Sequence, residues 1–199
     1  MFEHRITSEL SLELVEPRHA AALFGLTDDN REHLREWLPW LDGVRSVDDT
    51  KAFVESAQKQ LAEHRGFQTV IRFKEELVGI VGFHYIDWPS RTASIGYWLA
   101  RSAEGRGIMT RACEAYVQHA FADLGLHRIE IRCAVHNVKS RAIPERLGFR
   151  RESTVRDAEW LYDRFVDHVV YGMSVSDWRD SAKRQSRRGG GQSLGGFGQ

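Results

Sequence analysis

A short glycine loop at residues 104–110, Glu-Gly-Arg-Gly-Ile-Met-Thr, most constrains what this chain can fold into. It follows a strand-like run at 93–99 and precedes a stretch whose apolar residues repeat at helical spacing: Met109, Cys113, Tyr116, Ala120 and Leu124. A glycine loop between a strand and a helix exposes backbone N–H groups at the positive end of the helix dipole. The loop therefore favours an anion, above all a phosphate, and predicts a cofactor that carries a diphosphate.

The same loop has a plainer interpretation. Two glycines one residue apart often form only a tight turn, and short glycine motifs match by chance. The loop lacks the Gly-Lys-Ser/Thr ending of a Walker loop and the third glycine of a dinucleotide-binding turn. The phosphate interpretation therefore depends on what the rest of the chain provides.

Composition narrows the class of protein. The 199 residues are 42% hydrophobic, which is enough for one domain with a core, and the formal net charge of +0 gives no global attraction to nucleic acid or membranes. No apolar run could span a bilayer, and no signal-like segment follows the N-terminus. Cys113 and Cys133 are expected to be reduced core residues of a cytoplasmic protein. The nine histidines lack metal-ligand spacing, so no metal is expected.

Local patterns predict the order of the elements. Ser46 is expected to cap a helix that runs to about residue 64, and Pro17 suits the first turn of an earlier helix. Pro144 is tolerated only near the start of a helix, so the last predicted helix must begin close to Ser140. It ends at Gly148. The predicted strands are 10–15, 67–73, 77–85, 93–99, 127–135, 149–155 and 165–175, and the other predicted helices are 17–26, 30–40 and the one after the glycine loop.

The C-terminal segment differs in composition from the rest. Beyond residue 178 the chain becomes rich in arginine, glycine, serine and glutamine, with little to bury. We expect a single domain at 1–178 and a flexible Arg/Gly-rich tail at 179–199. A tail that binds RNA is an alternative, but a plain disordered end is favoured for so short a segment.

Taken together, the motifs resemble a known family, the GNAT superfamily of acetyl-CoA-dependent N-acetyltransferases. Within it the chain is similar to the RimJ/RimL-type branch, which acetylates protein N-termini, including those of ribosomal proteins. The resemblance covers roughly residues 5–178 and rests on the segments 34–40, 78–82, 95–99, 104–110, 137–140 and 147–149. Glu104 and Met109 depart from the general superfamily pattern but look normal for this branch, and Glu104 is expected to point away from the phosphates.

The resemblance implies a fold and a set of cofactor contacts. The fold is α+β, with a mixed, mostly antiparallel central sheet of about seven strands and helices on both faces. The cofactor is acetyl-CoA, leaving as coenzyme A, with no metal. Asn137 corresponds to a residue that binds the pantetheine arm, although from the sequence alone it could equally form a turn. The implied cofactor-binding residues are Trp98, Leu99, Gly105, Arg106, Gly107, Ile108, Met109, Thr110, Asn137 and Ser140.

The reaction implied by the resemblance is direct attack of a primary amine on the acetyl thioester. An α-amino group titrates near about 7.7–8.0, so a carboxylate at the acceptor end is a sufficient base for it. Glu159 is the candidate, expected on a loop between the last two strands, with Asp157 as the fallback and a plain solvated carboxylate as the alternative. Ser140 would face the departing sulfur as a hydrogen-bond donor, and it could also cap its helix.

The acceptor side remains more open. Trp37, Trp40, His84 and Tyr97 are candidate wall residues of the acceptor site, with core positions as the alternative. The expected acceptor is a protein or peptide N-terminus, with that of a ribosomal protein as one example. The alternatives are a small amine such as a polyamine, amino acid or drug, or a non-catalytic acyl-CoA-binding module. The tryptophan-rich N-terminal region could also serve a homodimer. No direct nucleic-acid or membrane partner is expected.

Overall fold

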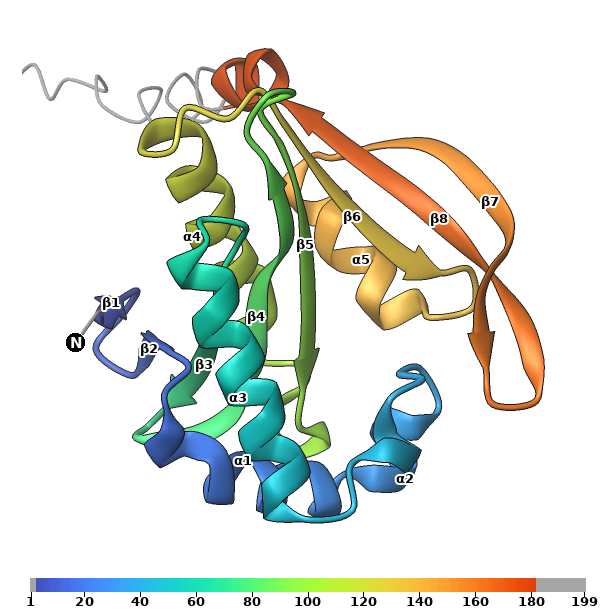
Figure 1. The fold of residues 1–199 in the computed structure, drawn as a ribbon. Coiled ribbons are helices and arrows are strands. Elements are labelled where there is room, and N and C mark those ends of the chain that lie inside the picture. The colour runs from blue at the N-terminus through green and yellow to red at the C-terminus, as the bar shows by residue number, and fades with distance from the viewer. Residues whose placement is uncertain (1–2, 182–199) are drawn as a thin grey trace, which may run out of the picture.

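The computed structural model describes residues 3–181, and these form one twisted sheet with helices on both of its faces (Figure 1). The strands are β1 (Glu3–Arg5), β2 (Leu10–Leu14), β3 (Gln68–Phe73), β4 (Glu76–Asp87), β5 (Thr92–Leu99), β6 (Arg128–Ala134), β7 (Arg150–Leu161) and β8 (Arg164–Ser174). The helices are α1 (Ala20–Asp29), α2 (Arg31–Arg35), α3 (Val47–Ala62), α4 (Ile108–Ala122) and α5 (Val138–Leu147), with short 3-10 turns at Pro17–His19, Leu41–Gly43 and Arg101–Ala103.

The sheet order is β1-β2-β3-β4-β5-β6-β8-β7, and among the strands of residues 3–181 only the β5–β6 pair is parallel. This confirms the predicted mixed, mostly antiparallel sheet. The described residues contain eight strands rather than about seven, because the sequence analysis missed β1, a three-residue strand with no buried position and hence no hydrophobic alternation.

The parallel pair separates along its length. β5 and β6 are in register from Thr92↔Arg128 to Ile95↔Ile131, and no further pairing joins them. Beyond that point β5 pairs only with β4, whereas β6 pairs only with β8. The result is a wedge that widens toward the C-terminal ends of both strands (Figure 1).

Two hydrophobic cores cover the two faces of the sheet. The larger core packs α4 and α5 against it, and the predicted stripe of α4 is confirmed, because Met109, Cys113, Tyr116 and Ala120 are all buried. The smaller core packs α1 and α3 on the other face, and Figure 1 shows α3 in front of the sheet with α4 behind it. Helices therefore lie on both faces, as expected.

The prediction for α5 is confirmed in its start and wrong in its reason. Asn137 is the N-cap and its side chain accepts the backbone N–H of Ser140 at 3.0 Å, so the helix begins at Val138, two residues before Ser140. Pro144 lies well inside the helix, where its missing N–H cannot bond the carbonyl of Ser140. The Tyr97 hydroxyl donates to that carbonyl instead, at 3.0 Å. A tertiary contact thus makes the interior proline tolerable.

Other boundaries follow the predictions to different degrees. Ser46 caps α3 through a capping box with Asp49, as expected. The predicted helix at 30–40 ends at Arg35. Residues 175–181 are helical, so the first residues beyond 178 continue an ordered element, and the Arg/Gly-rich stretch lies outside the described residues. The proposed domain limits stay a prediction.

Candidate functional site

The glycine loop has the backbone geometry that an anion site needs. Gly105 and Gly107 adopt left-handed φ angles of 74° and 69°, and Gly107 is the N-cap of α4. A Cβ added at Gly105 would meet nothing within 4 Å, and one at Gly107 would approach only the Arg111 guanidinium, at 3.6 Å. The space beside both glycines is therefore open to a ligand, and a diphosphate fits this loop because its backbone N–H groups precede a helix.

The side chains of the loop point in other directions. Ile108 and Met109 are buried in the larger core, so only their backbone N–H groups remain for a cofactor. Arg106 is exposed, lies over the ring of Phe73 at 5.8 Å, and accepts a bond from Arg111 through its carbonyl. The predicted charge contribution of Arg106 stays a prediction.

Glu104 connects the loop to two neighbouring helices. One carboxylate oxygen lies 3.0 Å from Nε2 of His33 in α2, and the other lies 2.5 Å from Nζ of Lys139 in α5. Both oxygens are engaged with side chains outside the loop, which agrees with the expectation that Glu104 points away from the phosphates. No local pattern in the sequence indicates these two partners, because the three residues are far apart in the chain.

The open edge of β5 forms one wall of the wedge. From Gly96 to Leu99 this strand pairs with β4 on one side and with nothing on the side of β6. The Trp98 side chain packs with the smaller core and lies 6.3 Å from the ring of Trp40, whereas Leu99 packs with the larger core. The backbone edge is thus what these residues offer to an amide-bearing arm, as a strand edge does for an added peptide.

Asn137 and Ser140 stand on the other wall. The Asn137 Oδ1 is used by the helix cap, which leaves Nδ2 as the group that could bind a carbonyl of a cofactor. The Ser140 hydroxyl donates to Cys133 Sγ at 3.2 Å and lies 3.3 Å from the Tyr97 hydroxyl. Burial raises the pKa of Tyr97 well above its usual value, so its hydroxyl stays protonated. Cys113 and Cys133 are both buried and free, as predicted.

Tyr97 lies beside Ser140, the candidate donor to the departing sulfur. Its ring packs with the larger core, and its hydroxyl binds the carbonyl of Ser140. Gly96 and Trp98, as its neighbours on the strand, face the opposite side of the sheet. The predicted acceptor role of Tyr97 stays a prediction, and the face of the sheet on which its ring lies depended on the register.

His84, a predicted acceptor-site residue, stands at a β-bulge of β4. β4 pairs with β5 at Phe83↔Ile95 and again at Tyr85↔Ser94, so His84 is the extra residue between them. A Cβ at Gly96 would overlap the His84 imidazole, so the glycine provides the space that the ring occupies. The His84 side chain is exposed to solvent on one side, but the surrounding protein partly desolvates the ring and lowers its pKa, and the charge of Glu159 partly opposes that shift. The imidazole is therefore neutral near pH 7.

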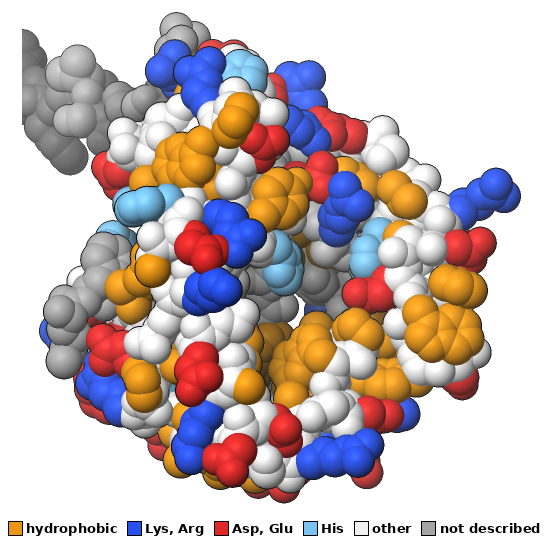
Figure 2. Space-filling view, in the orientation of Figure 1, with side chains coloured by type: hydrophobic (Ala, Val, Ile, Leu, Met, Phe, Trp, Pro, Cys, Tyr) orange, Lys and Arg blue, Asp and Glu red, His pale blue; other side chains and the backbone are white. Residues whose placement is uncertain are grey.

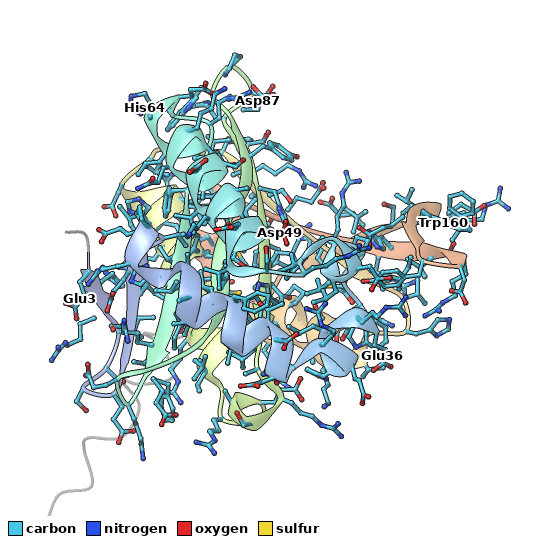
Figure 3. All side chains as sticks on the ribbon, turned by 60° about the horizontal axis from the view of Figure 1, so that its bottom comes forward. Glu3, Glu36, Asp49, His64, Asp87 and Trp160 are labelled. Atoms are coloured by element: carbon cyan, nitrogen blue, oxygen red, sulfur yellow. The ribbon has the colours of Figure 1, made fainter. Side chains whose placement is uncertain are left out.

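Glu159 lies on a strand and not on the loop that the sequence analysis expected. β7 continues to Leu161, and Glu159 pairs with Val166 just after an irregular stretch of the strand. Its Oε2 lies 3.5 Å from Nε2 of His168 on β8. The next residue, Trp160, is exposed at the outer end of the hairpin (Figure 3), so Glu159 faces inward. Sequence reasoning missed His168 because its proximity depends on that irregular register.

The N-terminal region closes one side of this space. The Tyr162 hydroxyl at the tip of the β7–β8 hairpin donates to the carbonyl of Leu38, and the Arg35 guanidinium lies 3.8 Å from the centre of the Tyr162 ring. Trp40 contacts Trp98, while Trp37 is half-buried and its predicted acceptor role stays a prediction. Figure 2 shows the resulting hollow in this face, with apolar and histidine side chains around it.

Two kinds of group are missing from the described residues. Within 3–181, no group of three His, Cys, Asp or Glu side chains is placed to hold a metal ion. No helix of that range is long and apolar enough to cross a membrane.

The fold and the loop define an acyl-CoA-type acetyltransferase scaffold, and comparison with known proteins identifies the family. Residues 9–150 match the acetyltransferase (GNAT) domain, so the chain belongs to the GNAT family and is an N-acetyltransferase. The ribosomal-protein-serine acetyltransferase of Escherichia coli (strain K12) is 33% identical over 173 residues, which span 86% of this chain and 96% of that protein.

Solved structures show the same relationship. A RimL ribosomal-protein α-N-acetyltransferase in complex with coenzyme A superposes with a TM-score of 0.85 at 28% identity, covering 88% of this chain and 99% of that one. The Microcin C7 self-immunity acetyltransferase MccE, in complex with acetyl-CoA and AMP, superposes with a TM-score of 0.81 at 29% identity, covering 85% and 94%.

Proposed function

We propose that the protein transfers an acetyl group from acetyl-CoA to the N-terminal α-amino group of a protein, of the ribosomal-protein type. The observation that carries this proposal is the wedge between β5 and β6. Ser140 lies on the β6 wall of the wedge. Glu159, from β7, and His84, from β4, are close enough for the carboxylate charge to act on the imidazole. The E. coli relative and the RimL structure, both named for ribosomal-protein acetylation, support the acceptor class.

Groups of this chain would hold acetyl-CoA, the acetyl donor, along the wedge. Acetyl-CoA supplies an acetyl group already activated as a thioester. The N–H groups of Gly105, Gly107 and Ile108 would bind its diphosphate, since their side chains leave the space clear or face the core. The free edge of β5 and Nδ2 of Asn137 would bind the amides of its arm.

Glu159 would accept the proton that the acceptor amine must lose. The acceptor arrives largely as an ammonium, and it can attack only after losing one proton, which the Glu159 carboxylate takes as an O–H bond forms. The nitrogen lone pair then forms the new C–N bond, the C–S bond breaks, and the electron pair leaves with sulfur. The nitrogen loses a second proton, so that one proton ends on the thiol and one in solvent.

Ser140 would assist the departing sulfur. Its hydroxyl already points to the base of the wedge, where it contacts Cys133 and Tyr97. Because a thiol titrates near about 8.5, the leaving thiolate needs a hydrogen-bond donor more than a full acid. The contribution of Ser140 is therefore a modest one.

A small amine is the second candidate acceptor. The observation in its favour is the MccE structure, which was solved with acetyl-CoA and AMP, a small molecule, on the same fold. The tip of the β7–β8 hairpin and the segment after α2 close one side of the hollow in Figure 2 together, through the Tyr162–Leu38 hydrogen bond, and this closure could narrow it to a small-molecule pocket.

Release of thiol from acetyl-CoA tests the two acceptors. One peptide set has a free N-terminal Ser, Ala or Met and no lysine, the other has a blocked N-terminus and one lysine, and spermidine and AMP serve as small-molecule controls. We expect release with the first set only. Release with lysine, spermidine or AMP alone would reassign the acceptor, and acetyl-CoA binding without release on any of them would favour a non-catalytic acyl-CoA-binding module.

The remaining partners follow from the same proposal. An enzyme for ribosomal proteins would work in the cytoplasm, beside its substrate. A homodimer stays a prediction: Trp40, one of the residues that suggested it, packs against Trp98, although it remains partly exposed.

A further inference from the structure

The β7 bulge places Glu159 in an unusual register. The ladder between β7 and β8 is regular at Val155↔His168 and resumes at Glu159↔Val166. Three residues of β7 therefore lie opposite one residue of β8, Asp167. Bulges of this kind re-aim a side chain and are frequent beside functional sites.

The bulge itself is fixed by a side chain. Asp157 has a left-handed φ of 50°, and its backbone N–H donates to Oδ1 of Asp167 at 2.9 Å. This bond satisfies an N–H that the broken ladder leaves without a strand partner. The backbone that carries Glu159 is thus tied to β8 on both sides of the bulge.

His168 lies where it can fix the carboxylate as well as the backbone. Paired residues of a ladder share a face, so Glu159, Val166 and His168 all project from the same side of the hairpin. His168 Nε2 is 3.5 Å from Glu159 Oε2, and its side chain is 16% exposed against 33% for the carboxylate. The histidine therefore lies deeper than the carboxylate, behind it with respect to solvent.

The backbone of His168 is rigidly placed. β8 is an interior strand there, and His168 pairs with Ala134 on β6 and with Val155 on β7. Its imidazole is consequently supported from both neighbouring strands, whereas Glu159 is close to the end of the hairpin. A fixed donor behind a more exposed carboxylate is the arrangement by which supporting groups orient reactive ones.

We propose that His168 is a positioning residue, which donates its Nε2–H to Oε2 of Glu159 and leaves Oε1 to face the acceptor amine. The proposal rests on the proposed role of Glu159 as the base. The 3.5 Å separation is long for a hydrogen bond. Bonds of this type are often long without substrate and tighten when it binds.

Two polar variants of His168, which differ in side-chain length, test this positioning role. Gln places its amide nitrogen close to the Nε2 position of histidine, whereas Asn places it nearer the Nδ1 position and falls short. We expect His168→Gln to keep kcat/KM for the best N-terminal peptide within about threefold and His168→Asn to lower it by about tenfold or more, mainly in kcat, because misplacement of a reacting group costs rate. Acetyl-CoA affinity should be unchanged in both.

A double-mutant cycle separates positioning from general damage. In a Glu159→Gln background, His168→Asn should have little further effect on kcat, since the group it positions is already lost. His119→Gln is the matched control, because His119 forms the same kind of pair with Asp123, at 2.7 Å, on the far end of α4. It should leave activity unchanged.

The outcomes are distinct. Equal activity of His168→Gln and His168→Asn, or additive losses in the cycle, would overturn the role of His168 while leaving the proposed function intact. Full activity of Glu159→Gln alone would instead remove Glu159 as the base, and the proposal for His168 with it.

Discussion

The glycine loop and the acceptor end are both irregular segments beside regular strands, but their irregularity has different origins. The loop depends on Gly105 and Gly107, whose conformations are set by residues within one turn of each other. The acceptor end depends on bulges at His84 and before Glu159, which exist only because of how β4 pairs with β5 and β7 with β8.

This difference shows which parts of such an enzyme depend on one short stretch of sequence. A backbone-built site uses N–H groups that every residue has, so it needs glycines in one short stretch and tolerates varied side chains around them. A site built from side chains needs particular groups at particular positions, brought from distant strands. We expect the backbone-built site to be impaired by a change of shape or charge at one residue. We expect the site built from side chains to be impaired by the loss of a single functional group.

The largest expected effect tests the backbone-built site. Gly107→Asp places a side chain and a negative charge beside the diphosphate position, so acetyl-CoA affinity should fall by more than about 100-fold, a loss of at least about 2.7 kcal/mol. Isothermal titration calorimetry measures this directly. Gly125→Asp is the control, because Gly125 also has a left-handed φ, of 64°, with nothing within 4 Å, but lies after α4. Normal binding by Gly107→Asp would show that the loop does not hold the diphosphate.

The next effect tests the side-chain site. Glu159→Gln should lower kcat by about 100-fold or more at pH 7, in the range of a general base, with acetyl-CoA affinity unchanged. The loss should shrink as the pH rises past about 8, where the amine deprotonates by itself. A pH series of initial rates gives this profile, and a loss that is constant with pH would argue that Glu159 acts in another way.

A smaller effect distinguishes two residues on the same wall of the wedge, Ser140 and Asn137. Ser140→Ala should lower kcat by about three- to tenfold and leave the melting temperature nearly unchanged, because Ser140 is not the cap of α5. Asn137→Ala removes the cap, and should lower the stability by about 1 kcal/mol. Paired thermal unfolding and rate measurements compare them, and a large drop in melting temperature for Ser140→Ala would contradict this division.

The smallest effect concerns pH. Because the folded protein lowers the pKa of His84, the unfolded chain binds more protons below about pH 6.5, and the folded state loses stability as the pH falls through that region. His84→Gln should remove this loss, reducing the drop in melting temperature between pH 7.5 and pH 5 by no more than about 2 °C, since solvent in the cleft screens the ring. His19, whose pKa burial also lowers, remains in both proteins and cancels in the comparison. An unchanged drop would show that His84 titrates normally.

The predictable parts of the fold were those whose cause lies within a few residues. The capping box of Ser46 and Asp49 sets the start of α3, the turn at Lys74 and Glu75 joins two strands, and the alternation of β6 sets its buried face. Each signal is a local pattern with a physical meaning, so it was visible without the tertiary structure.

The parts that could not be predicted depend on distant partners. Glu159 was assigned to a loop because the bulge in β7 hides the strand pattern, and the bulge needs Asp167 to bind the N–H of Asp157. The residue type and neighbourhood of the candidate base were predictable, but its strand position and its partner His168 were not. The pairing register had to be known first.

Pro144 and Tyr97 have a consequence for how sequences of this kind can change. The proline removes an N–H from the interior of α5, and the tyrosine hydroxyl satisfies the carbonyl that is left over. Loss of the Tyr97 hydroxyl alone would leave the Ser140 carbonyl without this hydrogen bond. A residue with an N–H at position 144 would make the hydroxyl dispensable. The order of exchange is thus constrained: among descendants of this chain we expect Tyr97 to be replaced only where position 144 has regained an N–H.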